Sequence, residues 1–177
     1  RQRIDEGEEL RDDGFFNEAS DRSEAEEVLE GALLAAQREN EEKKIEYIGY
    51  LMANVCFDSS VSRSEANLLI TTAEQMSWQQ IRILSVLGRV EEFGIDTPAQ
   101  FRDVFMEDSM PSDLIHEVER LINIGVVSKM GVGSSDFQGA GSFGHHSANE
   151  GVVSPMGERL YSLMELSEID PSSLSSL

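Results

Sequence analysis

Apolar side chains recur every three or four residues along the first half of the chain, which predicts a series of α-helices. Ser23 and Glu26 have the spacing of a capping box and mark the start of the first helix. A polar stretch at 37–44 interrupts the apolar pattern, which resumes at Ile45. The pattern therefore predicts either one bent helix or two helices, the second beginning near Asn40, with the polar stretch exposed.

Two further helix starts carry the same spacing of polar residues. Residues 62–65 read Ser-Arg-Ser-Glu and residues 77–80 read Ser-Trp-Gln-Gln, and apolar residues at helical spacing follow each of them. Because only residues 75–76 lie between the two helices, we expect the helices to meet at a tight corner. Trp78 is expected to hold this corner through the area that its ring buries.

The second half of the chain has the element order of a winged helix. Helices are predicted from Thr97-Pro98 and from Pro111, and Gly125 is suited to end the second one with left-handed dihedrals. The elements that follow are a short strand at 126–129, a glycine- and serine-rich loop at 130–150, a strand at 151–153 and a helix opened by Ser154-Pro155. Proteins with this order usually read the major groove of DNA.

We therefore predict a mainly α fold, in which a helical bundle is followed by a winged-helix-like unit with a small two-stranded β-hairpin. The predicted divisions are a charged N-terminal segment at 1–22, the bundle at 23–76, the winged-helix-like unit at 77–166 and a tail at 167–177. Because no linker separates Met76 from Ser77, the bundle and the winged-helix-like unit are expected to share one core.

The charge of the chain argues against reading DNA. The 34 Asp and Glu against 14 Lys and Arg give a formal net charge of −20, whereas affinity for nucleic acid rests on cations that replace phosphate counterions. The predicted recognition helix at 111–124 is acidic, and the loop at 130–150 contains no Lys or Arg. Binding to nucleic acid or to an anionic membrane surface is therefore not expected.

The acidic excess leaves two interpretations open. It is either an ordinary solvated surface that promotes solubility, or a surface that mimics nucleic acid or docks on a basic partner. For docking, the candidate residues are acidic side chains of the helix at 111–124 and two aromatic residues of the glycine-rich loop: Asp113, Glu117, Glu119, Phe137 and Phe143. The loop is expected to be a mobile connection of the hairpin.

No residue pattern predicts an enzymatic reaction, a cofactor or a metal. The one conceivable metal set consists of His116, Asp136, His145, His146 and Glu150. Adjacent histidines lack the i, i+4 spacing of a helical zinc site, so metal binding is not expected.

The single cysteine, Cys56, excludes an internal disulfide and favours a reducing, cytoplasmic location. It ends an apolar helix, where a free cysteine usually serves as a small buried hydrophobe. A nucleophile pair with His116 has no local signature. No apolar run approaches the roughly 20 residues that a membrane-spanning helix needs.

The span from Leu29 to Leu87 resembles the bacterial abortive-infection alpha family, helical proteins associated with phage defence. The matching segments are Leu29-Glu30-Gly31-Ala32-Leu33-Leu34, Tyr47-Ile48-Gly49-Tyr50-Leu51-Met52-Ala53-Asn54 and Ala73-Glu74-Gln75-Met76-Ser77-Trp78-Gln79-Gln80. The step Ser154-Pro155-Met156-Gly157 matches a serine-proline-x-glycine step near the end of the family. The resemblance implies no catalytic residues, and Asn54 is expected to cap or cross-link helices through its amide.

We therefore expect a non-enzymatic interaction or regulatory module of a bacterial antiphage system, which binds a protein partner or a second copy of itself. The alternatives are a winged-helix transcription regulator, an acidic nucleic-acid mimic that inhibits a basic enzyme, and a hydrolase that uses Cys56. A solvent-reactive Cys56 thiol is the observation that would favour the hydrolase.

Overall fold

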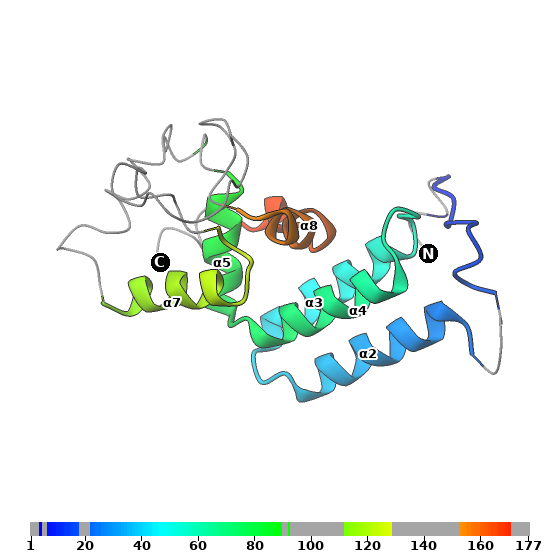
Figure 1. Ribbon diagram of the computed structural model, residues 1–177, viewed down its shortest axis with the longest axis horizontal. Coiled ribbons are helices and arrows are strands. Elements are labelled where there is room, and N and C mark those ends of the chain that lie inside the picture. The colour runs from blue at the N-terminus through cyan, green and yellow to red at the C-terminus, as the bar shows by residue number, and fades with distance from the viewer. Residues whose placement is uncertain are drawn as a thin grey trace, which may run out of the picture.

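The computed structural model describes residues 4, 7–17, 22–89, 92, 112–128 and 153–170 of the 177-residue chain. These residues form mainly α-helix, as predicted (Figure 1). The elements are α2 (Glu24–Arg38), α3 (Glu42–Val55), α4 (Arg63–Gln75), α5 (Trp78–Leu87), α7 (Ser112–Asn123), α8 (Pro155–Leu163) and the short 3₁₀-helix η1 (Leu166–Glu168).

The described residues do not show the predicted β-hairpin: they contain one isolated antiparallel bridge, between Val127 and Val153, and no longer strand. The helix predicted from Thr97, the glycine-rich loop at 130–150 and the end of the tail lie outside the described residues.

The helix starts predicted at Ser23, Ser62 and Ser77 are observed, with one difference in the capping of α4. Ser23 and Ser77 each form a complete capping box with the residue three positions on. The Ser62 hydroxyl accepts a hydrogen bond from the Glu65 amide, but the Glu65 carboxylate turns away and accepts from Arg159 Nε at 3.1 Å. The Glu65 carboxylate, which the local pattern predicted to complete the capping box, therefore binds an arginine that is distant in sequence.

The polar stretch at 37–44 separates two helices, and α3 begins at Glu42. The expectation that the whole stretch is exposed is wrong for Lys44, which is only 2% exposed. Lys44 lies four residues before the buried Ile48 and therefore on the inner face of α3. Its ammonium group forms an ion pair with Glu39 and donates a hydrogen bond to the Glu74 carbonyl at 3.2 Å.

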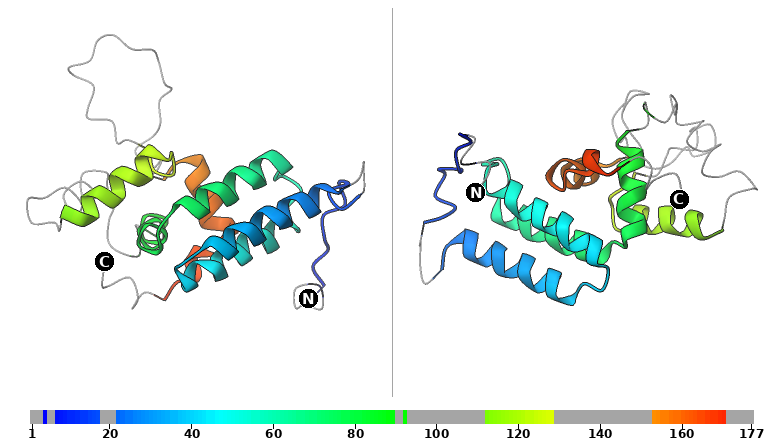
Figure 2. Two further views of the ribbon diagram at one scale, coloured as in Figure 1. Left: turned by 90° about the horizontal axis from the view of Figure 1, so that it is seen from below. Right: turned by 180° about the vertical axis from the view of Figure 1, so that it is seen from behind.

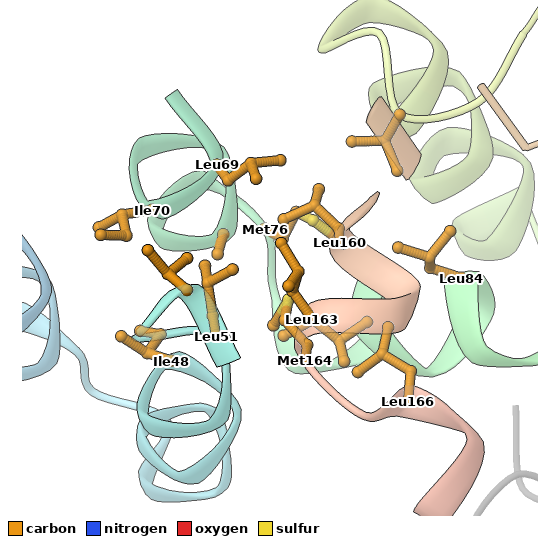
Figure 3. Close-up of a cluster of buried hydrophobic side chains, with 14 of the residues drawn as sticks. Ile48, Leu51, Leu69, Ile70, Met76, Leu84, Leu160, Leu163, Met164 and Leu166 are labelled. Atoms are coloured by element: carbon orange, nitrogen blue, oxygen red, sulfur yellow. The ribbon is translucent and has the colours of Figure 1, made fainter. Parts of the chain in front are cut away.

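Helices α2, α3 and α4 pack against one another, and α8 crosses α3, α4 and α5 on the side away from α2 (Figures 1 and 2). The buried apolar side chains form one cluster that includes residues from both predicted units, in accord with the expected shared core. Figure 3 shows Leu51 of α3 and Leu160 of α8 facing this core, with Leu84 of α5 beyond them; all three are 0% exposed.

Asn54 cross-links helices, as expected. Its amide nitrogen donates to the Leu163 carbonyl and to the Glu165 carboxylate, both at 2.9 Å, at the end of α8. This pair of bonds fixes the C-terminal end of α8 against α3.

The described part of the N-terminal segment is anchored by Arg11 and Phe15. The Arg11 guanidinium donates to the Val61 carbonyl at 2.8 Å and lies over the Phe15 ring, 4.2 Å from its centroid. Phe15 itself is 2% exposed, while Phe16 stays 40% exposed. Of these two adjacent aromatic residues, only Phe15 therefore packs fully onto the body.

The Glu39–Lys44 pair leads to a prediction on acid stability. Burial of Glu39 opposes its ionisation, but hydrogen bonds from Lys44 and from the Glu41 amide hold the pKa of the Glu39 carboxyl below its ordinary value. A lowered folded-state pKa contributes stability above the unfolded pKa, and this stability is lost as pH falls through the folded pKa. We expect Glu39→Gln to lower the free energy of unfolding by about 1 to 3 kcal/mol at pH 7, because Lys44 stays buried without its counter-charge. In urea unfolding, the difference from wild type should shrink below about pH 4.

The control for this prediction is Glu42→Gln. Glu42 is an exposed acidic residue of the same corner. Its replacement should change stability by no more than about 0.5 kcal/mol. A Glu39→Gln effect that is equally large at pH 7 and pH 3 would contradict the assignment to the ion pair.

Candidate protein-interaction surface

Helix α7 packs one face on α5 and turns the other to solvent. Val118 and Leu121 are 6% and 0% exposed on the packed face, and α7 and α5 are in direct contact. A hydrogen bond of 2.5 Å from Gln80 Nε2 of α5 to the Glu117 carboxylate ties the helices together at the edge of this interface. Gln80 thereby caps α5 with its oxygen and holds α7 with its nitrogen.

The outer face of α7 carries an open hollow of about 420 Å³. The described residues that line it are His116, Glu117, Glu119, Arg120 and Asn123, and we refer to them as the α7 face. The side chains of Glu119 and Arg120 are 62% and 69% exposed, and His116 Nδ1 lies 3.5 Å from the Glu119 carboxylate. The α7 face therefore offers carboxylate, imidazole, guanidinium and amide groups for hydrogen bonding with a partner.

A compact turn fixes the C-terminal end of α7 against α8. Gly125 has a φ of +78°, the left-handed value expected of a helix-ending glycine. The Ser154 hydroxyl donates to the Gly125 carbonyl at 2.6 Å and accepts from the Gly157 amide, so it caps α8 while binding the end of α7. The position of the α7 face is therefore set by α5 on one side and by the start of α8 on the other.

The five residues predicted to bind a partner have different outcomes. Glu117 and Glu119 lie together on the α7 face, although Glu117 is only 20% exposed and already bonded to Gln80. Asp113 lies in the first turn of α7, and its side chain is not described. Phe137 and Phe143 lie outside the described residues, as do His145 and His146 of the metal set.

Sequence reasoning missed His116, Arg120 and Asn123 as members of this surface. Their spacing of four and three residues places them on one side of the helix, and this spacing was visible in the sequence. What the sequence lacked was the side on which α7 packs against α5.

Most cations of the described residues are engaged with carboxylates. Those within 4.0 Å of a carboxylate oxygen are Arg11, Arg22, Arg38, Lys44, Arg63, Arg89, Arg120 and Arg159. Arg159 of α8 forms two of these ion pairs, with Asp58 and with Glu65. These pairs reduce the positive charge available to a phosphate backbone.

No catalytic constellation is evident in the described part of the chain. Within it, no group of three His, Cys, Asp or Glu side chains is suited to hold a metal ion. Cys56 is half-buried, and burial raises the pKa of its thiol, which lowers the fraction of reactive thiolate at neutral pH.

None of the helices formed by the described residues has the length and apolar character needed to cross a membrane. Comparison of the chain with family profiles, curated proteins and solved structures returned no match.

Proposed function

We propose that this chain is a non-enzymatic interaction module that binds a protein partner through the α7 face. The observation that carries the proposal is the division of α7 into two sides. Val118 and Leu121 are buried on the side that packs on α5. Glu119 is exposed on the other side, where it borders the open hollow. Exposed polar groups around a hollow on a rigidly held helix are suited to orient a partner.

We further propose that residues 77–166 form an acidic winged-helix-like unit. Three features support this. Helices α5 and α7 pack together, an antiparallel bridge pairs Val127 after α7 with Val153, and α8 begins directly after Val153 and Ser154. In such a unit α7 occupies the position of the recognition helix. The pairing of cations with carboxylates and the net charge of −20 favour a protein over DNA as its partner.

The resemblance of residues 29–87 to abortive-infection alpha proteins supports a role in bacterial antiphage defence. We therefore propose that the partner is present in bacterial cells during phage infection. This places the first search for the partner in infected cultures, with uninfected cultures as the comparison.

The test is affinity capture with the full chain and two charge-reversed variants. Glu119→Lys changes the α7 face, while Glu158→Lys makes the same change at an exposed position on α8. We expect wild type and Glu158→Lys to retain the same protein. Glu119→Lys should retain at least tenfold less of it, because the new lysine would repel the cationic groups of the partner that face Glu119. Circular dichroism should show equal folding of the three proteins.

Equal retention by Glu119→Lys and wild type would contradict the proposal. A salt-sensitive shift of duplex DNA by the wild-type chain would instead favour the transcription regulator. Recovery of a basic enzyme that wild type inhibits, and Glu119→Lys does not, would favour the nucleic-acid mimic.

A further inference from the structure

Helix α2 lies at the edge of the bundle, and its packing partners α3 and α4 lie on one side of it (Figures 1 and 2). Its inner side carries Val28, Ala32 and Ala35, which are 0%, 5% and 1% exposed. Ala25 also belongs to the core, so the leucines of α2 are additional to the residues that the core uses.

The side of α2 next to α4 is occupied by polar contacts. Glu27 accepts hydrogen bonds from Arg63 and from Asn67, at 3.2 and 3.1 Å. About three helical turns further along α2, Arg38 lies 3.5 Å from Glu74 of α4. Among the described residues, no such side-chain hydrogen bond or ion pair joins the opposite side of α2 to α3.

That opposite side exposes large apolar side chains. Leu29 and Leu33, four residues apart on α2, are 44% and 54% exposed, and Ile45 near the start of α3 is 39% exposed. Because a short turn joins α2 to α3, the two helices run antiparallel and bring the end of α2 beside the start of α3. We call the surface formed by Leu29, Leu33 and Ile45 the α2–α3 strip.

Gly49 extends the strip along α3, four residues beyond Ile45. A Cβ atom built on Gly49 meets no atom within 4 Å, so the space above it is open. A glycine in the middle of a helix costs stability relative to alanine. Here it keeps the exposed side of α3 flat next to the leucines of α2.

Carboxylates border the α2–α3 strip on both helices. On α2, Glu26 lies three residues before Leu29 and Glu30 lies three residues before Leu33. On α3, Glu42 lies three residues before Ile45 and Glu46 directly follows it. Glu30 forms an ion pair with Arg22 at 2.5 Å and Glu46 accepts a hydrogen bond from the Tyr50 hydroxyl, while Glu42 is exposed. The surface is therefore apolar along its middle, and its edges keep a net negative charge.

We propose that the α2–α3 strip binds an amphipathic helix of a protein partner, one that carries an apolar stripe flanked by Lys or Arg. Apolar residues at i and i+4 match the side-chain spacing of such a helix, and basic flanks complement the acidic edges. The 15 residues of α2 correspond to about 22 Å, so a partner helix of roughly four turns can lie along it. Leu29 and Leu33 lie near the middle of that length, about one turn apart.

A second copy of this chain is a poorer occupant than a basic helix. Two strips placed face to face would bring their acidic edges together, and each chain carries a net charge of −20. The α2–α3 strip is formed by helices other than α7, so this inference does not rest on the function proposed for the α7 face.

The test uses a synthetic amphipathic helix of 14 residues with leucines at i, i+4, i+7 and i+11 and lysines on the flanks. Its binding to the full chain is measured by fluorescence polarisation. A peptide of the same composition with the leucines dispersed around the helix is the comparison probe. We expect the amphipathic probe to bind at least tenfold more tightly than the dispersed one, and more weakly at high salt.

Two pairs of variants locate the binding surface. Leu33→Gln removes an apolar side chain from the strip, and Leu68→Gln makes the same change on α4 at a side chain that is equally exposed, 55% against 54%. Gly49→Gln fills the open space of the strip, while Gly49→Ala leaves it largely open. We expect Leu33→Gln and Gly49→Gln to weaken probe binding at least fivefold, and their controls to weaken it less than twofold.

Two results would overturn the proposal. One is equal binding of the two probes, or equal effects of Leu33→Gln and Leu68→Gln, which would indicate attraction by net charge alone. The other is a dimer in sedimentation equilibrium that Leu33→Gln dissociates and Leu68→Gln does not, since a second copy would then occupy the strip. Neither result bears on capture through the α7 face, so failure of one proposal is distinguishable from failure of the other.

Discussion

Replacing Gly157 by alanine is expected to lower the free energy of unfolding by about 3 kcal/mol, which places this change among the most destabilising single substitutions in the chain. A Cβ atom at this position would lie 2.2 Å from the Val126 carbonyl oxygen and 2.7 Å from Val153 Cγ1. Val126 lies in the turn that follows α7, and Val153 lies just before α8. Because the closest atom is backbone, relief of the clash requires that the turn after α7 move away from α8.

Movement of the turn has a further cost. The Gly157 amide donates to the Ser154 hydroxyl, which in turn donates to the Gly125 carbonyl. Moving α8 outward breaks this linkage and leaves buried polar groups without partners. The larger side chain of valine in Gly157→Val is expected to prevent folding of the C-terminal helices altogether.

Gly49→Ala is the matched control for Gly157→Ala. Both glycines lie within helices, but a Cβ atom at Gly49 meets no atom within 4 Å. Gly49→Ala should therefore raise stability by about 0.5 to 1 kcal/mol through helix propensity. Urea unfolding of the two variants measures the difference directly. If Gly157→Ala is as stable as Gly49→Ala, then α8 does not approach the turn as closely as described.

This contrast shows which features the sequence can predict. Helix starts at Ser23 and Ser77 and the helix end at Gly125 depend on residues within four positions, so the local pattern was sufficient. The glycine of the step at 154–157 was also visible as part of a motif. Its role depends on the Val126 carbonyl, about thirty residues away in the chain, and no local pattern reports that distance.

Polar side chains show the same limit more sharply. Glu65 was expected to complete a capping box but binds Arg159, and Lys44 was expected in solvent but is buried with Glu39. In each case a distant partner competes with water or with the local backbone for a charged group. The outcome is decided by which helices come into contact, and residue type alone does not encode that choice.

The candidate site was predictable to the extent that its residues lie in one helix. The acidic character of the helix at 111–124 and the inclusion of Glu119 followed from the sequence. The half-buried state of Glu117 did not, because it results from the hydrogen bond with Gln80 on α5. The α2–α3 strip was missed for a similar reason, since its leucines have ordinary helical spacing and only the packing of α2 shows which of them remain exposed.

Replacing Arg89 by methionine is expected to lower the free energy of unfolding by about 3 kcal/mol, although the change keeps a long side chain. Arg89 is 8% exposed and lies just after α5. Its guanidinium donates to the Ser167 carbonyl at 3.2 Å, the Ile169 carbonyl at 3.0 Å and the Ser85 hydroxyl at 2.8 Å. Methionine fills the space but donates no hydrogen bond, so the buried acceptors on Ser85 and Ile169 lose their charged donor.

The effect of Arg89→Met should be greatest in the segment that follows α8. The Ser85 hydroxyl, itself 0% exposed, donates to the Leu166 carbonyl at 2.7 Å, so Ser85 and Arg89 together bind η1 to α5. Hydrogen exchange should therefore show the largest loss of protection at the amides of residues 166–169, before global unfolding. Arg89→Lys should fall between wild type and Arg89→Met, since an ammonium group cannot bridge the same separated acceptors as a guanidinium fork.

Arg38→Met is the matched control for Arg89→Met. Arg38 also forms an ion pair, with Glu74 at 3.5 Å, but its side chain is 67% exposed. Its loss should change stability by no more than about 0.5 kcal/mol, because water replaces the exposed partner. Equal effects of the two substitutions would mean that Arg89 acts as one more surface cation. A large effect confined to Arg89 would indicate that this acidic protein uses a buried arginine to hold its C-terminal helices on the bundle.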